Sequence, residues 1–186
     1  MRRRHVLVAA GASMAALSGC LGGDTEYKIS EASIDSGDSA VSLSVEVTDP
    51  EIRIGDPGAL EITLGAGETS VQIRARGVLP FGLAALRLDA ERKVLLHSAA
   101  YNDTSLVEVS DGGISVDDRR LTDELGPGES VTERYTVRVD DVFTDGSYSV
   151  GRYFREYLMS YRSSDEPWTQ LTPGGGVSIE TLSGLL

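Results

Sequence analysis

Apolar and polar residues alternate with a period of two from residue 40 onward, and turn-forming residues interrupt the pattern at short intervals. The first run places Val41, Leu43, Val45 and Val47 on one face and polar side chains on the other. Because successive side chains of an extended chain point to opposite faces, this alternation predicts a half-buried strand. Turn signals follow at Asp49-Pro50, Asp56-Pro57-Gly58 and Gly65-Ala66-Gly67. The pattern restricts this part of the chain to short strands joined by turns.

The alternation continues toward the C-terminus and predicts about seven to nine short strands, as a β-sandwich requires. We expect an all-β fold in which residues 40–186 form a single β-sandwich. Residues 106–116 predict a hairpin around Asp111-Gly112-Gly113. Residues 83–96 fit a hairpin better than a helix, although the spacing allows both, and residues 153–161 fit either a strand or one helical face.

Residues 125–139 give the clearest strand signal of this region. A Gly126-Pro127-Gly128 turn precedes a run that carries Val131, Tyr135, Val137 and Val139 on one parity. The text Leu-x-Pro-Gly-Glu-Ser, a strand, and then Asp145-Gly146-Ser147-Tyr148 resembles immunoglobulin-like and fibronectin-like surface domains over roughly residues 120–162. That resemblance implies that the sandwich is immunoglobulin-like.

The N-terminal segment has the layout of an export signal. Arg2, Arg3 and Arg4 precede an apolar run from Val6 to Leu17 that is 12 residues long. A membrane-spanning helix needs roughly 20 apolar residues, so the run is too short for a permanent anchor and is typical of a signal peptide. We therefore expect residues 1–19 to be a signal peptide; the alternative is a buried N-terminal helix.

Two motifs in this segment resemble known export and lipidation signals. Arg3-Arg4-His5-Val6-Leu7 resembles the twin-arginine export motif, and Leu17-Ser18-Gly19-Cys20 matches the lipobox of lipoproteins. The resemblance implies that cleavage leaves a lipidated Cys20 on the extracytoplasmic face of the cell membrane. General secretory export is the alternative route. Residues 20–39 are rich in glycine, serine and acids, which predicts a flexible tether, although Tyr27, Ile29 and Ile34 also fit a first strand.

The charge balance is strongly acidic. The chain has 17 Lys+Arg and 29 Asp+Glu, a formal net charge of −12, and lysine occurs only at Lys28 and Lys93. Such a lysine-poor, acidic composition resembles proteins of extremely halophilic archaea, where salt screens self-repulsion; an ordinary acidic protein is the alternative. The balance argues against nucleic acid as a partner. We interpret the pairs Arg74/Arg76 and Arg119/Arg120 as solvated charges on strand faces.

No residue pattern predicts catalysis. His97 is the only histidine after the signal and follows an apolar run, no serine lies in a Gly-x-Ser-x-Gly elbow, and Cys20 is the only cysteine. We therefore expect no enzyme, no catalytic residues, no cofactor and no zinc site. Calcium stays an alternative at two acidic turns, although solvated surface acids explain them better: Asp111, Asp117 and Asp118; Asp140, Asp141 and Asp145.

Three aromatic residues are the candidate binding residues, namely Trp168, Tyr161 and Tyr157, although such residues more often fill a core. Asn102-Asp103-Thr104 is a sequon, so Asn102 is a candidate glycosylation site or a turn residue.

We expect a membrane-anchored, non-enzymatic binding or structural module of the cell envelope, with an envelope protein or polymer as its partner. The alternatives are an accessory lipoprotein that presents a solute or ion to a transporter, and a hydrolase of envelope polymers.

Overall fold

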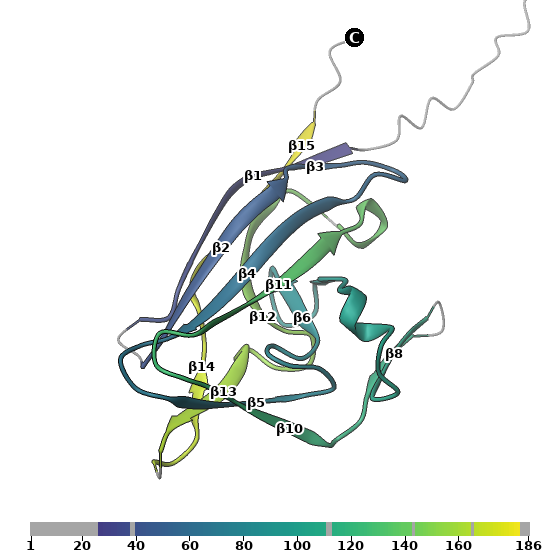
Figure 1. Ribbon diagram of the computed structural model, residues 1–186. Helices are drawn as coiled ribbons and strands as arrows, with labels where there is room; N and C mark the ends of the chain where they lie inside the picture. Colours follow the sequence, from purple (N-terminus) through teal and green to yellow (C-terminus); the bar gives the residue numbers. More distant parts are fainter. Residues whose placement is uncertain (1–25, 38–39, 111–112, 143, 165, 183–186) are drawn as a thin grey trace, which may run out of the picture.

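The computed structural model describes residues 26–37, 40–110, 113–142, 144–164 and 166–182 (Figure 1). Arg3, Arg4 and Cys20 lie outside the described residues, and so do Asp111 and Gly112 of the expected hairpin turn. The described part is all-β, as predicted, with fifteen strands in four sheets and two short 3-10 helices. All named strand pairings are antiparallel.

The largest sheet has six strands in the order β3 (Glu51–Ile52), β1 (Glu26–Asp35), β15 (Gly174–Leu182), β12 (Gly146–Arg152), β6 (Ala84–Arg87) and β7 (Lys93–Leu95). A three-stranded sheet has the order β11 (Ser130–Val137), β4 (Gly58–Ala66) and β2 (Val41–Asp49). A four-stranded sheet has the order β10 (Arg120–Leu125), β5 (Val71–Arg76), β13 (Met159–Ser163) and β14 (Thr169–Leu171). The remaining elements are the hairpin of β8 (Val107–Ser110) and β9 (Gly113–Val116), and the helices η1 (Ala99–Tyr101) and η2 (Val139–Asp141).

The six-stranded and three-stranded sheets are joined where the chain leaves β7. His97 and Thr136 of β11 exchange two backbone hydrogen bonds of 3.0 and 2.8 Å. In Figure 1 these two sheets curl around one side of the core, and the four-stranded sheet lies across the other end of the molecule. The β8–β9 hairpin stands apart at the side.

The core is built from the alternating apolar positions. In β5, Val71, Ile73 and Ala75 are buried, whereas the residues between them face the other way and are half-buried. The same alternation buries one face of β15 through Val177 and Ile179. The predicted period of two is therefore confirmed for these strands. Their polar side chains lie on the face of the sheet that points away from the core.

The expected number of strands, about seven to nine, is wrong, because the described chain has fifteen. Several of the additional strands are only two or three residues long, such as β3, β7 and β14. A segment of two or three residues is too short to show an alternation of apolar and polar residues. It is recognised as a strand only from the neighbouring strand with which it pairs. The immunoglobulin-like character of the sandwich stays a prediction.

The two expected hairpins are present. β6 pairs with β7 in the register Ala85↔Leu95, so residues 83–96 contain a hairpin and no helix. β8 pairs with β9, as expected for residues 106–116. In the ambiguous segment 153–161, a loop leads into β13, which begins at Met159.

Residues 26–35, which the composition assigned to a flexible tether, form β1. Ile29 and Ile34 are buried, and β1 pairs with both β15 and β3. The serines and acids that give this segment the composition of a tether occupy exposed positions of the strand. The alternative prediction, a first strand with Tyr27, Ile29 and Ile34, is therefore the correct one for these residues. Helices in the described residues are all too short to cross a membrane.

Candidate functional site

Strand β5 places two arginines on its outward face. Arg74 and Arg76 alternate with the buried residues of this strand, so both side chains point away from the core. The neighbouring strand β10 sets Arg120 directly opposite Arg76, and β13 sets Ser160 opposite Arg74. Like charges that face each other across antiparallel strands are destabilising. Two arginines in this register thus create positive charge that the sheet does not neutralise.

A fourth arginine, Arg152, enters from the end of β12. Its backbone N–H donates to the Arg155 carbonyl at 3.0 Å, and the Arg155 N–H donates back at 3.2 Å, so a tight turn brings Arg155 alongside. Gly82, with φ +68°, makes room for the Arg152 side chain. A Cβ at Gly82 would lie 2.8 Å from the Arg76 carbonyl oxygen and 3.2 Å from Nε of Arg152. Glycine is therefore required there by both the backbone conformation and the close approach.

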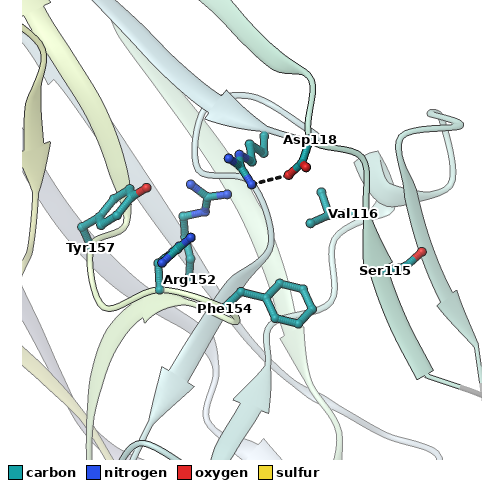
Figure 2. Close-up of a pocket in the computed structure, with 8 residues that line it drawn as sticks. Ser115, Val116, Asp118, Arg152, Phe154 and Tyr157 are labelled. Atoms are coloured by element: carbon teal, nitrogen blue, oxygen red, sulfur yellow. Dashed lines mark hydrogen bonds and ion pairs between the residues drawn. The ribbon is translucent and has the colours of Figure 1, made fainter.

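These side chains line three adjoining cavities, which we call the arginine trough. The first has a volume of about 360 Å³ and is lined by Arg76, Ser115, Val116, Asp118, Arg152, Phe154, Arg155 and Tyr157 (Figure 2). The second, of about 110 Å³, is lined by Arg74, Ala75, Arg76, Arg120, Arg152, Tyr157, Ser160 and Gln170. The third, of about 470 Å³, is lined by Arg87, Phe154, Arg155, Glu156, Tyr157, Gln170 and Thr172. Tyr157 lines all three, so the three cavities lie next to one another.

Arg152 is the most buried charge of the trough, with 7% of its surface exposed. Within the described residues its guanidinium has no carboxylate partner, and its contact is with the Tyr157 ring, 5.6 Å from the centroid. Burial lowers the pKa of Arg152; the nearby charges of Arg76 and Arg155 lower it further, against an opposing effect of Tyr157. Removing a charge from water lowers the stability of the fold by roughly several kcal/mol when no partner is present, and a bound anion would offset that loss. The trough is thus arranged to receive negative charge.

Asp118 supplies the one ion pair found among the described residues that line the trough. Its carboxylate lies 2.5 Å from an Nη atom of Arg76, and its side chain is 90% exposed. Exposed pairs contribute about 0–1 kcal/mol, so a ligand anion can replace Asp118 at little cost. In Figure 2, Arg152 lies between Tyr157 and Asp118, with Phe154 beside it.

Aromatic rings border the arginines. The guanidinium carbon of Arg74 lies 4.0 Å from the Trp168 ring centroid, and that of Arg162 lies 4.8 Å from it. Such contacts are cation–π interactions. Burial lowers the pKa of Arg74, and the neighbouring charge of Arg120 acts in the same direction. Phe154 is 49% exposed.

The structure separates the three aromatic candidates. Tyr157 lines the trough, and Trp168 adjoins it through Arg74. Tyr161 instead packs against the hydrophobic core and lines none of the three cavities. Whether any of them binds a ligand stays a prediction.

The arginines are what sequence reasoning missed. Arg74, Arg76 and Arg120 were interpreted as solvated charges, yet all three line one cavity with Arg152. They come from β5, β10 and β12, whose proximity depends on long-range pairing that no local pattern reveals. The available signal was the choice of arginine over lysine in an acidic chain.

His97, the one candidate for a catalytic base, is held by a structural contact. Its Nε2 lies 2.7 Å from Oδ2 of Asp141, and its backbone pairs with Thr136. The neighbouring Ser98 hydroxyl donates to Glu133. Among the described residues, no three His, Cys, Asp or Glu side chains gather as metal ligands would.

Asn102, the candidate glycosylation residue, is exposed at the C-cap of η1. Its position is accessible, and its modification stays a prediction.

Comparison with known proteins gives one match. No curated protein and no solved structure matches the chain. A family model described as "Domain of unknown function (DUF8130)" matches residues 1–186. The chain therefore belongs to the DUF8130 family.

Proposed function

We propose that the protein is a lipid-anchored, extracytoplasmic binding module of the cell envelope that takes an anionic ligand into the arginine trough without chemical conversion. The observation that carries the proposal is Arg152, a residue 7% exposed that lines the trough beside Arg76 and Arg155 and has no carboxylate partner among the described residues. Arginines held close together lower the stability of the free protein, and an anionic ligand that pairs with them would account for their placement.

The chemistry of arginine supports an anion with oxygen atoms. A guanidinium donates two parallel hydrogen bonds to a carboxylate, phosphate or sulfate, which fixes both distance and orientation. These short-range bonds matter more than long-range attraction in this chain, because its formal net charge of −12 repels an approaching anion. In the saline surroundings of a halophile, screening removes most of that repulsion and leaves the bonds inside the trough.

The geometry favours binding over hydrolysis. Asp118 and Glu156, the carboxylates of the trough, line different cavities, and Asp118 pairs with Arg76. Hydrolysis of a glycosidic bond needs two carboxyl groups that flank the same bond. The accessory lipoprotein of a transporter would use the same trough to present an anionic solute, and co-purification of a transporter from membranes distinguishes that role.

The finer fold assignment is also part of the proposal. The Tyr148 hydroxyl donates to the Thr144 carbonyl at 2.6 Å, four residues upstream, at the start of β12. Immunoglobulin-like sandwiches carry such a tyrosine corner, in which the hydroxyl bonds to the backbone a few residues upstream. This contact falls on the Asp145-Gly146-Ser147-Tyr148 motif and supports an immunoglobulin-like sandwich of the haloarchaeal lipoprotein type.

Anion binding is tested by calorimetric titration of the full chain, in mild detergent, with inorganic phosphate at constant ionic strength. We expect saturable heat that chloride does not give. Arg152→Met is expected to weaken phosphate binding at least about tenfold, since a hydrogen bond to a charged group contributes about 1.5–3 kcal/mol. The matched control is Arg134→Met on β11, whose side chain is 62% exposed and lines none of the three cavities. Identical heats for phosphate and chloride would refute the proposal.

The anchor rests on Arg3, Arg4 and Cys20 and has its own test. Cys20→Ala is expected to move the protein from the membrane fraction to the soluble fraction of fractionated cells, because the lipid would have no attachment site. Unchanged partitioning of Cys20→Ala would remove the lipid anchor from the proposal.

A further inference from the structure

We propose that the ligand of the arginine trough is an acidic oligosaccharide, a chain of sugar rings in which successive units carry a carboxylate. The inference rests on the proposed function, since it assumes that the trough binds an anion. It adds a chemical class, which follows from the kinds of side chain that line the three cavities.

Arginines line all three cavities of the trough, and four of them share the second cavity. Arg74 and Arg120 line the second cavity, Arg76 and Arg152 line both the first and the second, and Arg87 lines the third. A single small anion engages only one part of such a series. A ligand with several carboxylates along one chain engages all of it, and each additional contact becomes intramolecular.

An apolar surface lies between the charges. Phe154 lines both the first and the third cavity, and 49% of its surface is exposed. Tyr153 fixes its orientation by an edge-to-face contact, with ring centroids 5.1 Å apart. The electron-rich face of an aromatic ring attracts the C–H groups on one side of a sugar ring. The exposed Phe154 ring thus lies beside the arginines, so a sugar ring can pack on it while its carboxylate pairs with a guanidinium.

Uncharged polar side chains complete the lining. Ser115 and Ser160 border the first and second cavities, and Gln170 and Thr172 border the third. Within the described residues, the hydrogen bonds of the protein involve none of these four side chains. They are available to the hydroxyl groups of a sugar, which both donate and accept hydrogen bonds.

Single-stranded nucleic acid, another polyanion, fits this lining less well. Its bases stack on successive open aromatic faces. Here the Trp168 ring is contacted by both Arg74 and Arg162, and Arg152 lies over the Tyr157 ring. Phe154 is left as an exposed platform of the trough, which suits one sugar face better than a row of bases.

The experiment compares four probes on the full chain in mild detergent, by calorimetric titration at a salt concentration where the protein is folded. The probes are galacturonate, its linear trimer, the neutral methyl ester of that trimer, and a trinucleotide of thymidine. We expect the trimer to bind at least about tenfold more tightly than the monomer, because it engages several arginines at once. We expect no saturable heat from the methyl ester, and weaker binding of the trinucleotide than of the acidic trimer.

A variant pair tests the apolar surface. Phe154→Ala is expected to weaken trimer binding by about fivefold or more, as truncation of an interface aromatic does. The matched control is Ile54→Ala, an exposed apolar residue outside the trough (61% exposed), which should leave trimer binding unchanged.

Two results overturn the inference in distinguishable ways. Equal affinities for monomer and trimer, or tighter binding of the trinucleotide, would overturn the acidic oligosaccharide while the proposed anion binding stands. Absence of heat from the acidic trimer and from inorganic phosphate alike would overturn the proposed function as well.

Discussion

Arg152→Met is expected to increase the stability of the ligand-free protein while it removes anion binding. Arg152 is 7% exposed as a residue and its guanidinium lies near two other arginines, so the folded state carries a partly desolvated charge without a carboxylate partner among the described residues. Replacing buried charge by a packed apolar side chain is commonly neutral or stabilising, by about 1–4 kcal/mol. Methionine also retains an unbranched chain against the Tyr157 ring.

The measurement is the free energy of unfolding from denaturant titration, with and without ligand. The exposed control, Arg134→Met, is expected to change that free energy by no more than about 0.5 kcal/mol. The opposite sign for Arg152→Met, a loss of more than about 1 kcal/mol, would show that the guanidinium supports the fold and would weaken the case for a ligand site.

Gly176→Ala is expected to destabilise the protein by roughly 3 kcal/mol or more. A Cβ on this residue of β15 would lie 2.3 Å from the backbone oxygen of Tyr148 and 3.1 Å from its carbonyl carbon. Neither atom can move freely, because Tyr148 is paired with Val177 in the same sheet. The substitution must therefore separate β15 from β12, the strand that ends at Arg152.

Thermal and denaturant unfolding measure this effect, and Gly126→Ala is the matched control. The added Cβ at Gly126 would meet only the side chain of Glu129, which can move aside. We expect a loss of less than about 1 kcal/mol for the control. A loss of stability for Gly176→Ala as small as that of the control would mean that β12 and β15 separate without cost, contrary to their paired register.

The sequence predicts the parts of this molecule that depend on neighbouring residues. The alternation in β5 and β15 and the pairing within the β6–β7 and β8–β9 hairpins follow from local sequence, and all of these are confirmed. Strand β1 was harder to recognise, since its serines and acids give it the composition of a tether although Ile29 and Ile34 are buried.

The trough could not be predicted in this way. Arg76 and Arg120 are adjacent only because β5 pairs with β10, and Arg152 reaches them from another sheet. Each arginine alone reads as an ordinary surface charge. Their joint meaning depends on their meeting at one cavity and on the burial of Arg152, which are properties of the folded chain.

Strand β1 also has a consequence for how the protein stands on a membrane. With lipid on Cys20 and the first strand beginning at Glu26, the connecting chain reaches at most about 20 Å. If Cys20 carries the proposed lipid, a connection this short would hold the domain close to the bilayer and limit its tumbling. In Figure 1 the start of β1 lies at one end of the molecule, and β5, β10 and β13 lie at the other. The strands that carry Arg74, Arg76 and Arg120 would then face outward, toward material that surrounds the cell.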